Sequence, residues 1–411
     1  MTKMNIFKSL SNFFSYLMLS LLVFYFVLPG FYKIYPYSIS LVCLIIFLFQ
    51  HSSVCKKTVL PIMSLFFFVV LADLINMMCG SAVLSDFEKI LRNIVLIFPF
   101  LLFLSHFSIQ VKEIIWVGAC LFLVTLFFMT LQKYGLYAQN ASHYDHQHPG
   151  LWFNKGSFST AIVLFFALFA GFAVQVDEKI VKWLLLIITL SMFAILYLTQ
   201  ARGPLLAFVY ILIFCSIYTL SMYGYTKSKI FFLMAMLIFI ISLAAYLIAG
   251  SRMSLAWQQL LEHFSEGSSP TSVSIRIDTW KLAWDVFLHN PIVGVGANNI
   301  NSVKEYIVEK GDYPPYILKY HTHSEYFLTL ERGGVVGLIG LFWMMFYPFF
   351  SLKKCGVDFT KMSPLFLVVG SFMIIGITSA TIRNNIGANS FIFCLLSAYF
   401  ISYKYYRREL K

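Results

Sequence analysis

The chain has 411 residues, of which 60% are hydrophobic, 18% aromatic and only 12% charged. Soluble domains carry about 25% charged residues, so this composition, with a mean hydropathy of +0.80, excludes a globular core wrapped in a polar surface. The net charge of +12 comes from basic residues spread over many short segments, which is typical of membrane topology and argues against a nucleic-acid-binding protein. The seven cysteines are scattered without a CxxC pair and indicate neither a disulfide framework nor a zinc site.

Apolar segments long enough to cross a bilayer recur along the whole chain, and each crossing requires roughly 20 apolar residues. The first segment has no small-residue cleavage site, so we expect it to begin the helical bundle. The sequence therefore predicts an all-α polytopic membrane protein with about 12 transmembrane helices. A hydrophobic window with loop breaks places them at 11–28, 34–50, 59–79, 90–106, 112–131, 157–175, 181–199, 204–223, 229–250, 326–350, 363–381 and 387–404.

Lysines and arginines predict the orientation, because cytoplasmic connections are enriched in them. With the N-terminus in the cytoplasm, both termini lie inside and two long segments, 132–156 and 251–325, lie outside. The predicted organisation is spans 1–9 over 1–250, a periplasmic loop domain over 251–325, and spans 10–12 with a cytoplasmic tail over 326–411. Long outer connections are usually functional, so we expect the chemistry on that face. The inner basic residues include Lys112, Lys179, Lys182, Lys353, Lys354 and Lys361.

Two ionisable features precede the middle of the chain. Asp73, in the third predicted span, is the one clear mid-membrane charge and is a functional candidate by default, although a single charge does not make a transport path. The stretch HYDHQHPG contains His143, Asp145, His146 and His148, which are metal-ligand residue types. A single short loop with no second ligand group elsewhere favours a flexible polar loop instead. We therefore expect no metal and no cofactor.

Arg202, in LTQARGPLLAF, lies in a connection of a few residues on the outer side. The following Pro204 is typical of the first turn of a helix. One interpretation is an interfacial arginine whose guanidinium reaches the lipid head groups. The other is a functional cation, because a tight turn holds its side chain in place. The sequence leaves both open.

The outer loop contains SVSIRIDTWKLAWDVFLHNPIVGVGANN, in which a helix is predicted before NPIVGVG. Apolar residues at helical spacing predict one apolar face, so this helix would lie on the bilayer or cap the bundle. We expect Arg276 in its first turn, where the helix dipole disfavours a cation. A bound phosphate would explain that position, and a solvated arginine is the alternative. The predicted face consists of Ile277, Trp280, Trp284, Phe287 and Leu288.

The stretch YHTHSEYFLTLERGGVVGLIG begins a predicted span with several ionisable groups. Thr322 and Glu325 fit the capping box T-x-x-E, with Thr322 as the N-cap. That interpretation leaves His321 and His323 unexplained. A histidine has a near-neutral pKa and can accept a proton, and a helix N-terminus favours a bound anion. His323 is therefore a candidate catalytic residue.

The predicted topology places Arg202, Arg276 and His323 at the outer surface, and Arg383, in the last outer loop, adds positive charge there. Two guanidiniums can bind phosphate oxygens through bidentate hydrogen bonds. A neighbouring histidine can take a proton from a hydroxyl, and the embedded bundle would admit a lipid tail. These groups favour glycosyl or phosphoryl transfer from a lipid pyrophosphate, with the arginines neutralising the leaving group in place of a metal.

The same stretches resemble the bacterial O-antigen ligases, part of a membrane superfamily with O-antigen polymerases and protein O-oligosaccharyltransferases. Arg202 to Leu206 fits the pattern R-x-x-x-L. The pattern H-[N/S/Q]-x(9)-G-x-x-[G/T/Y] fits at His323, Ser324, Gly334 and Gly337. The resemblance extends from about residue 150 to the C-terminus. A further run similar to the superfamily's loop signature comprises Arg276, Trp280, Asn290, Pro291, Gly294 and Gly296.

The resemblance implies a GT-C-like bundle in the bacterial inner membrane with its active site facing the periplasm. It implies an undecaprenyl-pyrophosphate-linked O-antigen donor, a lipid A-core acceptor, and inverting transfer without ATP, metal or cofactor. His323 would activate the acceptor hydroxyl, while Arg202 and Arg276 would hold the departing pyrophosphate. Ser324 occupies a slot that is often Asn in relatives. The residues expected to bind substrate are His321, Arg383, Trp280 and Ser324.

The sequence leaves three other functions open. An O-antigen polymerase would use similar chemistry, although the longer histidine pattern favours a ligase, and a protein-glycosylating relative is a third member of the superfamily. A transporter of lipid-linked polysaccharide belongs to another class. Transporters place substrate sites near the midplane on broken helices, whereas here the ionisable groups gather at one face. The expected partners are these substrates and membrane lipids, with no nucleic acid, and the sequence indicates no oligomeric state.

Overall fold

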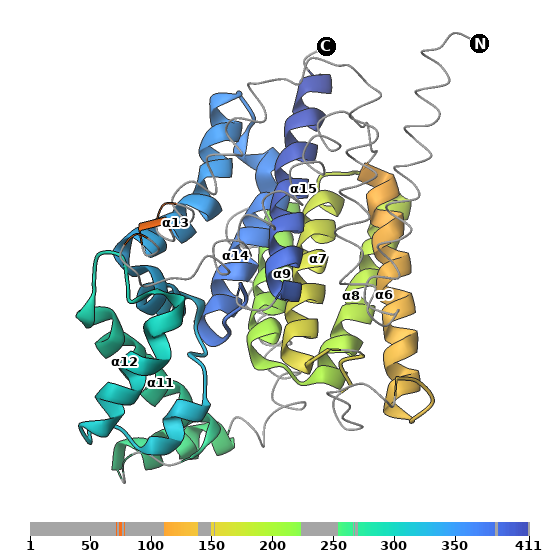
Figure 1. The fold of residues 1–411 in the computed structure, drawn as a ribbon. Coiled ribbons are helices and arrows are strands. Elements are labelled where there is room, and N and C mark those ends of the chain that lie inside the picture. The colour runs from red at the N-terminus through yellow and green to blue at the C-terminus, as the bar shows by residue number, and fades with distance from the viewer. Residues whose placement is uncertain are drawn as a thin grey trace.

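Figure 1 shows the computed structural model of the chain, which describes residues 71, 74, 75, 78, 111–138, 149–151, 153–222, 254–265, 267, 270–382 and 385–409. Within these ranges all regular secondary structure is helical, as the composition predicts. The predicted spans at 11–28, 34–50, 90–106 and 229–250, and nearly all of 59–79, lie outside the described residues.

The other seven predicted spans are confirmed as helices, with ends within a few residues of the prediction. Each is long and apolar enough to cross a membrane, the sixth together with the short 3-10 helix η3 (Phe359–Met362) before it. The described part of the chain is thus that of a multi-pass membrane protein. These helices are α6 (Val111–Lys133), α7 (Lys155–Ala173), α8 (Lys179–Thr199), α9 (Arg202–Met222), α13 (Glu325–Lys354), α14 (Ser363–Thr378) and α15 (Asn385–Glu409).

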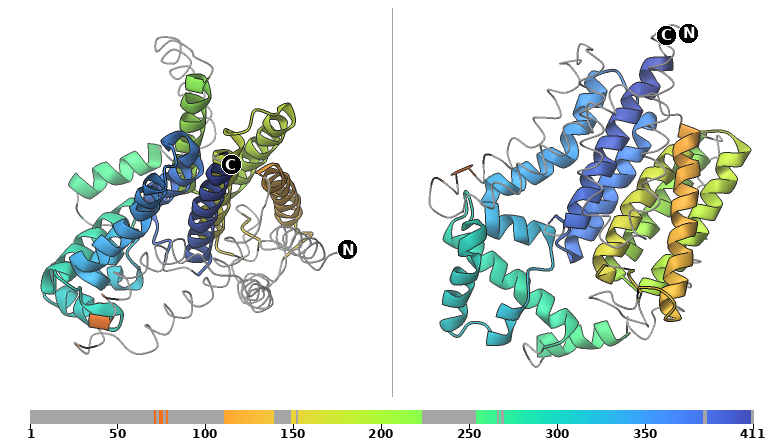
Figure 2. Two further views of the ribbon diagram at one scale, coloured as in Figure 1. Left: turned by 90° about the horizontal axis from the view of Figure 1, so that it is seen from above. Right: turned by 45° about the vertical axis from the view of Figure 1, so that its right-hand side comes forward.

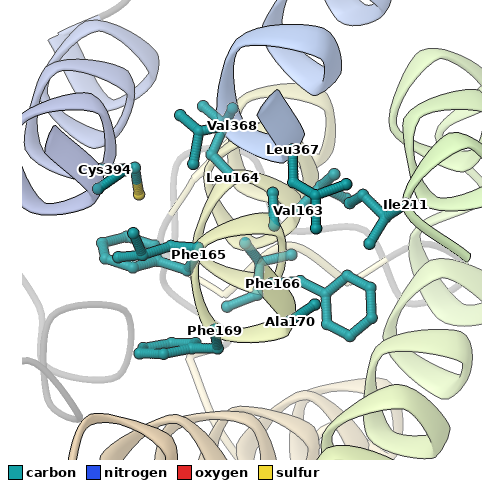
Figure 3. Packing of buried hydrophobic residues seen from close by; sticks show 14 of the residues in the cluster. Val163, Leu164, Phe165, Phe166, Phe169, Ala170, Ile211, Leu367, Val368 and Cys394 are labelled. Carbon is teal, nitrogen blue, oxygen red and sulfur yellow. The ribbon is translucent and has the colours of Figure 1, made fainter. Parts of the chain in front are cut away.

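Helix α7 is the centre of the bundle, and its sequence is apolar on all sides, which is typical of a helix buried all round. Every residue from Phe158 to Ala173 is buried, and α7 packs against α6, α8, α9, α14 and α15. Its phenylalanines, seen in Figure 3, contact Phe122 of α6, Phe208 of α9 and Phe393 of α15. Since lipid tails are as apolar as these side chains, close packing is what holds the helices together.

The bundle has two chemically different ends. At one end an ion pair of 3.1 Å joins Lys112 at the start of α6 to Glu178 before α8, and Gln175 Nε2 donates to the Lys361 carbonyl at 2.9 Å. We call this the lysine end, because the predicted inner lysines of α6, α8, α13 and η3 gather there. We call the opposite end the arginine end, after Arg202. It includes the start of α9, the start of α13 and the end of α14 (Figures 1 and 2).

A smaller helical unit lies beside the arginine end (Figure 1). It contains a helix over 254–265, α11 (Ser272–His289), α12 (Gly296–Glu309) and the 3-10 helix η2 (Pro315–Lys319). Both α11 and α12 also pack against α13, so the unit continues into the beginning of that span. Its own apolar core consists of Leu282, Val286, Val295, Ile307, Val308 and Ile317.

The predicted apolar face of α11 is only partly buried, since Phe287 is buried and Ile277 and Trp280 are half-buried. Trp284 and Leu288 of the same predicted face are 47% and 56% exposed, whereas Leu282 and Val286 are buried. The buried face also carries polar residues such as Asp278. An apolar pattern misses such a face, because polar residues can be buried when they bond to one another.

Helix α13 is kinked at Gly334, where the backbone is not helical (φ 59°, ψ −155°). Beyond the kink, the N–H groups of Val335 and Val336 donate to the carbonyls of Pro291 and Ile292 at 2.9 and 3.0 Å. The segment between α11 and α12 thus takes the place of the preceding helical turn as the acceptor. This explains how the first turns of α13 can lean toward α11 while the rest of the helix crosses the bundle.

Two glycines allow the segment between α11 and α12 to pack directly against the kink of α13. A Cβ atom at Gly294 would overlap the backbone at Arg332, and one at Gly334 would overlap the backbone at Ile292. Both glycines have positive φ, 68° and 59°, which other residues rarely adopt. We call this close backbone contact between Gly294 and Gly334 the packing joint. Both glycines belong to the sequence patterns described above.

We expect Gly334→Ala to lower the stability of the protein severely, because positive φ alone costs about 1–3 kcal/mol and the new methyl group would overlap backbone atoms. The matched control is Gly337→Ala, whose Cβ would lie 3.4 Å from the nearest atom, the Thr329 carbonyl oxygen. The melting temperature in detergent and the abundance in membranes should fall for Gly334→Ala only. Equal melting temperatures for the two variants would contradict the packing joint.

Candidate active site

The start of α13 is bonded to the end of α14. Ser324, the residue before the helix, has extended backbone, and its Oγ donates to the Gly376 carbonyl at 3.2 Å. The buried Glu325 accepts a hydrogen bond at Oε2 from the Ile382 N–H at 2.8 Å. These bonds fix the chain that leads into α13 at the arginine end of the bundle.

The predicted capping box is wrong. The N-cap of α13 is Ser324, without a side-chain cap bond, and Glu325 is the first residue of the helix. Thr322 is fully buried and bonds instead to Lys304 and Glu331. The pattern fails because both of its residues have stronger partners in other parts of the fold.

His321 and His323 lie next to each other, with ring centroids 4.2 Å apart and ring planes at 45°. His321 is exposed, and His323 is half-buried. A neutral imidazole has one nitrogen that accepts a proton, so either ring can act as a base. His323 precedes the anchored Ser324, which holds its backbone while its side chain remains accessible.

Arg202, predicted in the short connection between two spans, is the first residue of α9. Helix α8 ends at Gln200 in a left-handed conformation (φ 50°), so the connection consists of Gln200 and Ala201. A Cβ atom at Gly203 would overlap the side chain of Thr378. Because Thr378 is the last residue of α14, Arg202 lies beside the same helix end that binds Ser324.

Arg276, expected in the first turn of α11, lies in its second turn, since that helix begins at Ser272 and is capped by the Thr271 hydroxyl, which accepts from the Ser274 N–H. It is half-buried. Burial, and second the nearby charge of Arg202, lower the pKa of the Arg276 guanidinium. The two arginines, from helices far apart in the sequence, are therefore close enough to repel each other, and an anion between them would remove that repulsion.

Trp280 connects α11 to the histidine segment. One turn after Arg276, its ring stacks on Phe327, with centroids 5.9 Å apart and planes at 17°. Phe327 is one turn after His323. The Trp280 Nε1 atom is buried and has no hydrogen-bond partner among the described residues. The stacking brings the Arg276 face of α11 against the start of α13.

These contacts place Arg202, Arg276 and the His321–His323 segment at one end of the bundle. A family model described as O-antigen ligase matches residues 185–342, which contain all of them. This match supports a member of the O-antigen ligase and polymerase superfamily. No curated protein matches the chain significantly.

Membership in the O-antigen ligase and polymerase superfamily supports a membrane glycosyltransferase-like activity on lipid-linked polysaccharide. The matched range begins within α8, contains α9, α11 and α12, and ends in α13 just beyond the kink. It thus spans the arginine end, the outer helical unit and the packing joint, and the site and the family match coincide.

Some predicted residues of this superfamily member lie outside the described residues. Arg383 is one of them, although its neighbour Ile382 is bonded to Glu325 at the site. Asp73 and the histidine loop at 143–148 are also outside the described residues. Their predicted roles stay predictions.

Two buried polar clusters were not predicted. In one, Ser274 Oγ lies 2.8 Å from His263 Nδ1 and donates to Asp278 Oδ2 at 3.2 Å, which joins the 254–265 helix to α11. In the other, Lys304 and Glu331 form a buried ion pair of 2.8 Å. The only sequence signal for the second is an acidic residue inside the beginning of an apolar span, where charges are costly.

Proposed function

We propose that the chain is an O-antigen ligase, which transfers O-antigen polysaccharide from undecaprenyl pyrophosphate to the lipid A-core oligosaccharide. The observation that carries this proposal is that Arg202, beside the end of α14, and Arg276, on the helix that stacks on Phe327, lie at the same end of the fold as the anchored histidine segment. Paired guanidiniums suit a pyrophosphate, because each can donate two parallel hydrogen bonds to phosphate oxygens. The long histidine pattern at His323 and Ser324 supports a ligase rather than a polymerase.

The reaction follows from these groups. His323 accepts the proton of an acceptor sugar hydroxyl as the oxygen attacks the anomeric carbon of the donor. The bond between that carbon and the pyrophosphate oxygen breaks, and both electrons leave with the pyrophosphate. Arg202 and Arg276 stabilise the charge of the leaving group. Attack from the face opposite the leaving group inverts the anomeric centre, and the imidazolium then releases its proton to solvent.

The arrangement of charge supports the orientation. The lysine end would face the cytoplasm, because cytoplasmic connections are enriched in lysine and arginine. The arginine end, with α11 and α12, would then face the periplasm across the bacterial inner membrane, with both termini cytoplasmic. The undecaprenyl tail would remain in the bilayer beside the bundle while its pyrophosphate reaches the arginines at the surface. The guanidiniums supply the positive charge, so we expect transfer to proceed in the presence of a metal chelator.

The test is a lipopolysaccharide gel of the source strain with the gene deleted and then restored. A ligase deletion leaves the core without any O-antigen and accumulates lipid-linked polymer. A core that still receives one repeat unit would identify a polymerase instead. An unchanged ladder would contradict both and return transport or another acceptor to consideration.

A further inference from the structure

The buried ion pair between α12 and α13 includes a third residue. Lys304 Nζ lies 2.8 Å from Glu331 Oε2 and donates to Glu331 Oε1 and Thr322 Oγ1, both at 3.1 Å. Thr322 Oγ1 in turn donates to Glu331 Oε1 at 2.9 Å. The three residues are 7%, 1% and 0% exposed. The three side chains therefore form a closed triangle of hydrogen bonds that is buried from the surface.

Thr322 lies between the two histidines of the candidate site. Its hydroxyl both accepts from Lys304 and donates to Glu331, so the side chain is held in one rotamer and its backbone is fixed at that point. On the other side of His323, Ser324 is bonded to Gly376. His323 is thus the residue between two anchored hydroxyl side chains, one tied to the outer helical unit and one to the bundle.

Stability alone does not explain an ion pair at this place. Burying two charges costs several kcal/mol per ion, and apolar residues of similar volume often stabilise a protein as well or better. Glu331 also belongs to the packing joint, because its carbonyl accepts from the Val295 N–H at 3.0 Å. The backbone of Glu331 is therefore held at the packing joint, and its carboxylate holds the Thr322 hydroxyl.

We propose that Lys304 and Glu331, acting through the Thr322 hydroxyl, are positioning residues that fix the place of His323 in the candidate site. This inference rests on the proposed function. It assigns a reason to a buried charge pair that the transfer chemistry itself does not use. It also explains why a threonine, which has both a donor and an acceptor, stands between the histidines.

The sharpest test is Thr322→Val, which keeps the shape of the side chain and removes only the hydroxyl, with Thr322→Ser as the matched variant that restores it. The assay uses purified protein in detergent, lipid-linked polysaccharide extracted from the deletion strain as donor, and core lipopolysaccharide lacking O-antigen as acceptor. We expect kcat of Thr322→Val to fall about 10²-fold, the effect of a misplacement near 1 Å, with the KM for donor nearly unchanged. Thr322→Ser should recover most of kcat.

The His323→Ala variant in the same assay separates the two proposals. If His323→Ala is inactive while Thr322→Val has the wild-type kcat, the positioning role is wrong and the proposed function stands. If His323→Ala is fully active, the catalytic assignment itself is wrong. If Thr322→Val loses kcat and Thr322→Ser does not recover it, the hydroxyl is not the cause and the positioning role is again contradicted. The melting temperature of each variant shows whether lost activity is lost folding.

Discussion

Replacing His323 with alanine should reduce transfer at least about 10²-fold, since a general base typically contributes 10²–10⁴-fold. The protein should remain folded. His323 is half-buried, and its backbone is held by the neighbours on both sides, so removal of the imidazole leaves those anchors in place. Initial rates with the purified variant, and a lipopolysaccharide gel of the deletion strain that carries it, measure the loss.

His321→Ala is the matched control for this experiment. His321 belongs to the same segment, and its ring lies 4.2 Å from that of His323, but its side chain is exposed. We expect a smaller loss than for His323→Ala, because His321 is expected to bind substrate rather than to accept the proton, and water can replace an exposed ring. A larger loss for His321→Ala would exchange the roles of the two histidines. Loss of membrane abundance in His323→Ala would instead indicate a structural role.

The spans could be predicted because membrane burial leaves a long apolar signal in the sequence. All seven predicted spans that lie in the described residues are helices. The place of Arg202 at the boundary between two spans could be predicted for a related reason, since the apolar segments on both sides leave a connection of only a few residues. Local signals of this kind depend only on neighbouring residues.

The parts that could not be predicted depend on partners far along the chain. Thr322 fits a capping box but is bonded to Lys304 and to Glu331, nine residues on. The pairing of Lys304 with Glu331 joins residues 27 positions apart, and no pattern of charges indicates it. A sequence motif shows which residues are present, and a buried network decides which of several hydrogen bonds each one makes.

The same distinction holds for the glycines. The spacing from His323 to Gly334 and Gly337 marks a family pattern, but the spacing does not say that the two glycines differ. Gly334 forms the packing joint, whereas Gly337 has room for a methyl group. Glycine is required at position 334, because a Cβ atom there would overlap backbone atoms. At position 337 a Cβ atom would make only ordinary contacts.

Arg276→Lys should reduce transfer at least about 10-fold although it preserves the charge, because lysine lacks the planar fork that binds two phosphate oxygens at once. Arg276→Gln, which removes the charge, should lose more. Lys281→Gln is the control, since Lys281 is an exposed cation on the same helix α11. Wild-type rates for Arg276→Lys would contradict bidentate binding, and an equal loss for Lys281→Gln would indicate a general effect of positive charge.

Binding of inorganic pyrophosphate tests the same pair without turnover. Burial and the charge of Arg202 lower the pKa of Arg276, so the protonated pair is under repulsion that an anion removes. A ligand that binds only the folded state stabilises it by about 2.7 kcal/mol at 100 times Kd. Pyrophosphate should therefore raise the melting temperature of the wild type and of Lys281→Gln, and much less that of Arg276→Gln. Equal shifts in all three would place the anion elsewhere and would contradict the role of Arg276 in binding pyrophosphate.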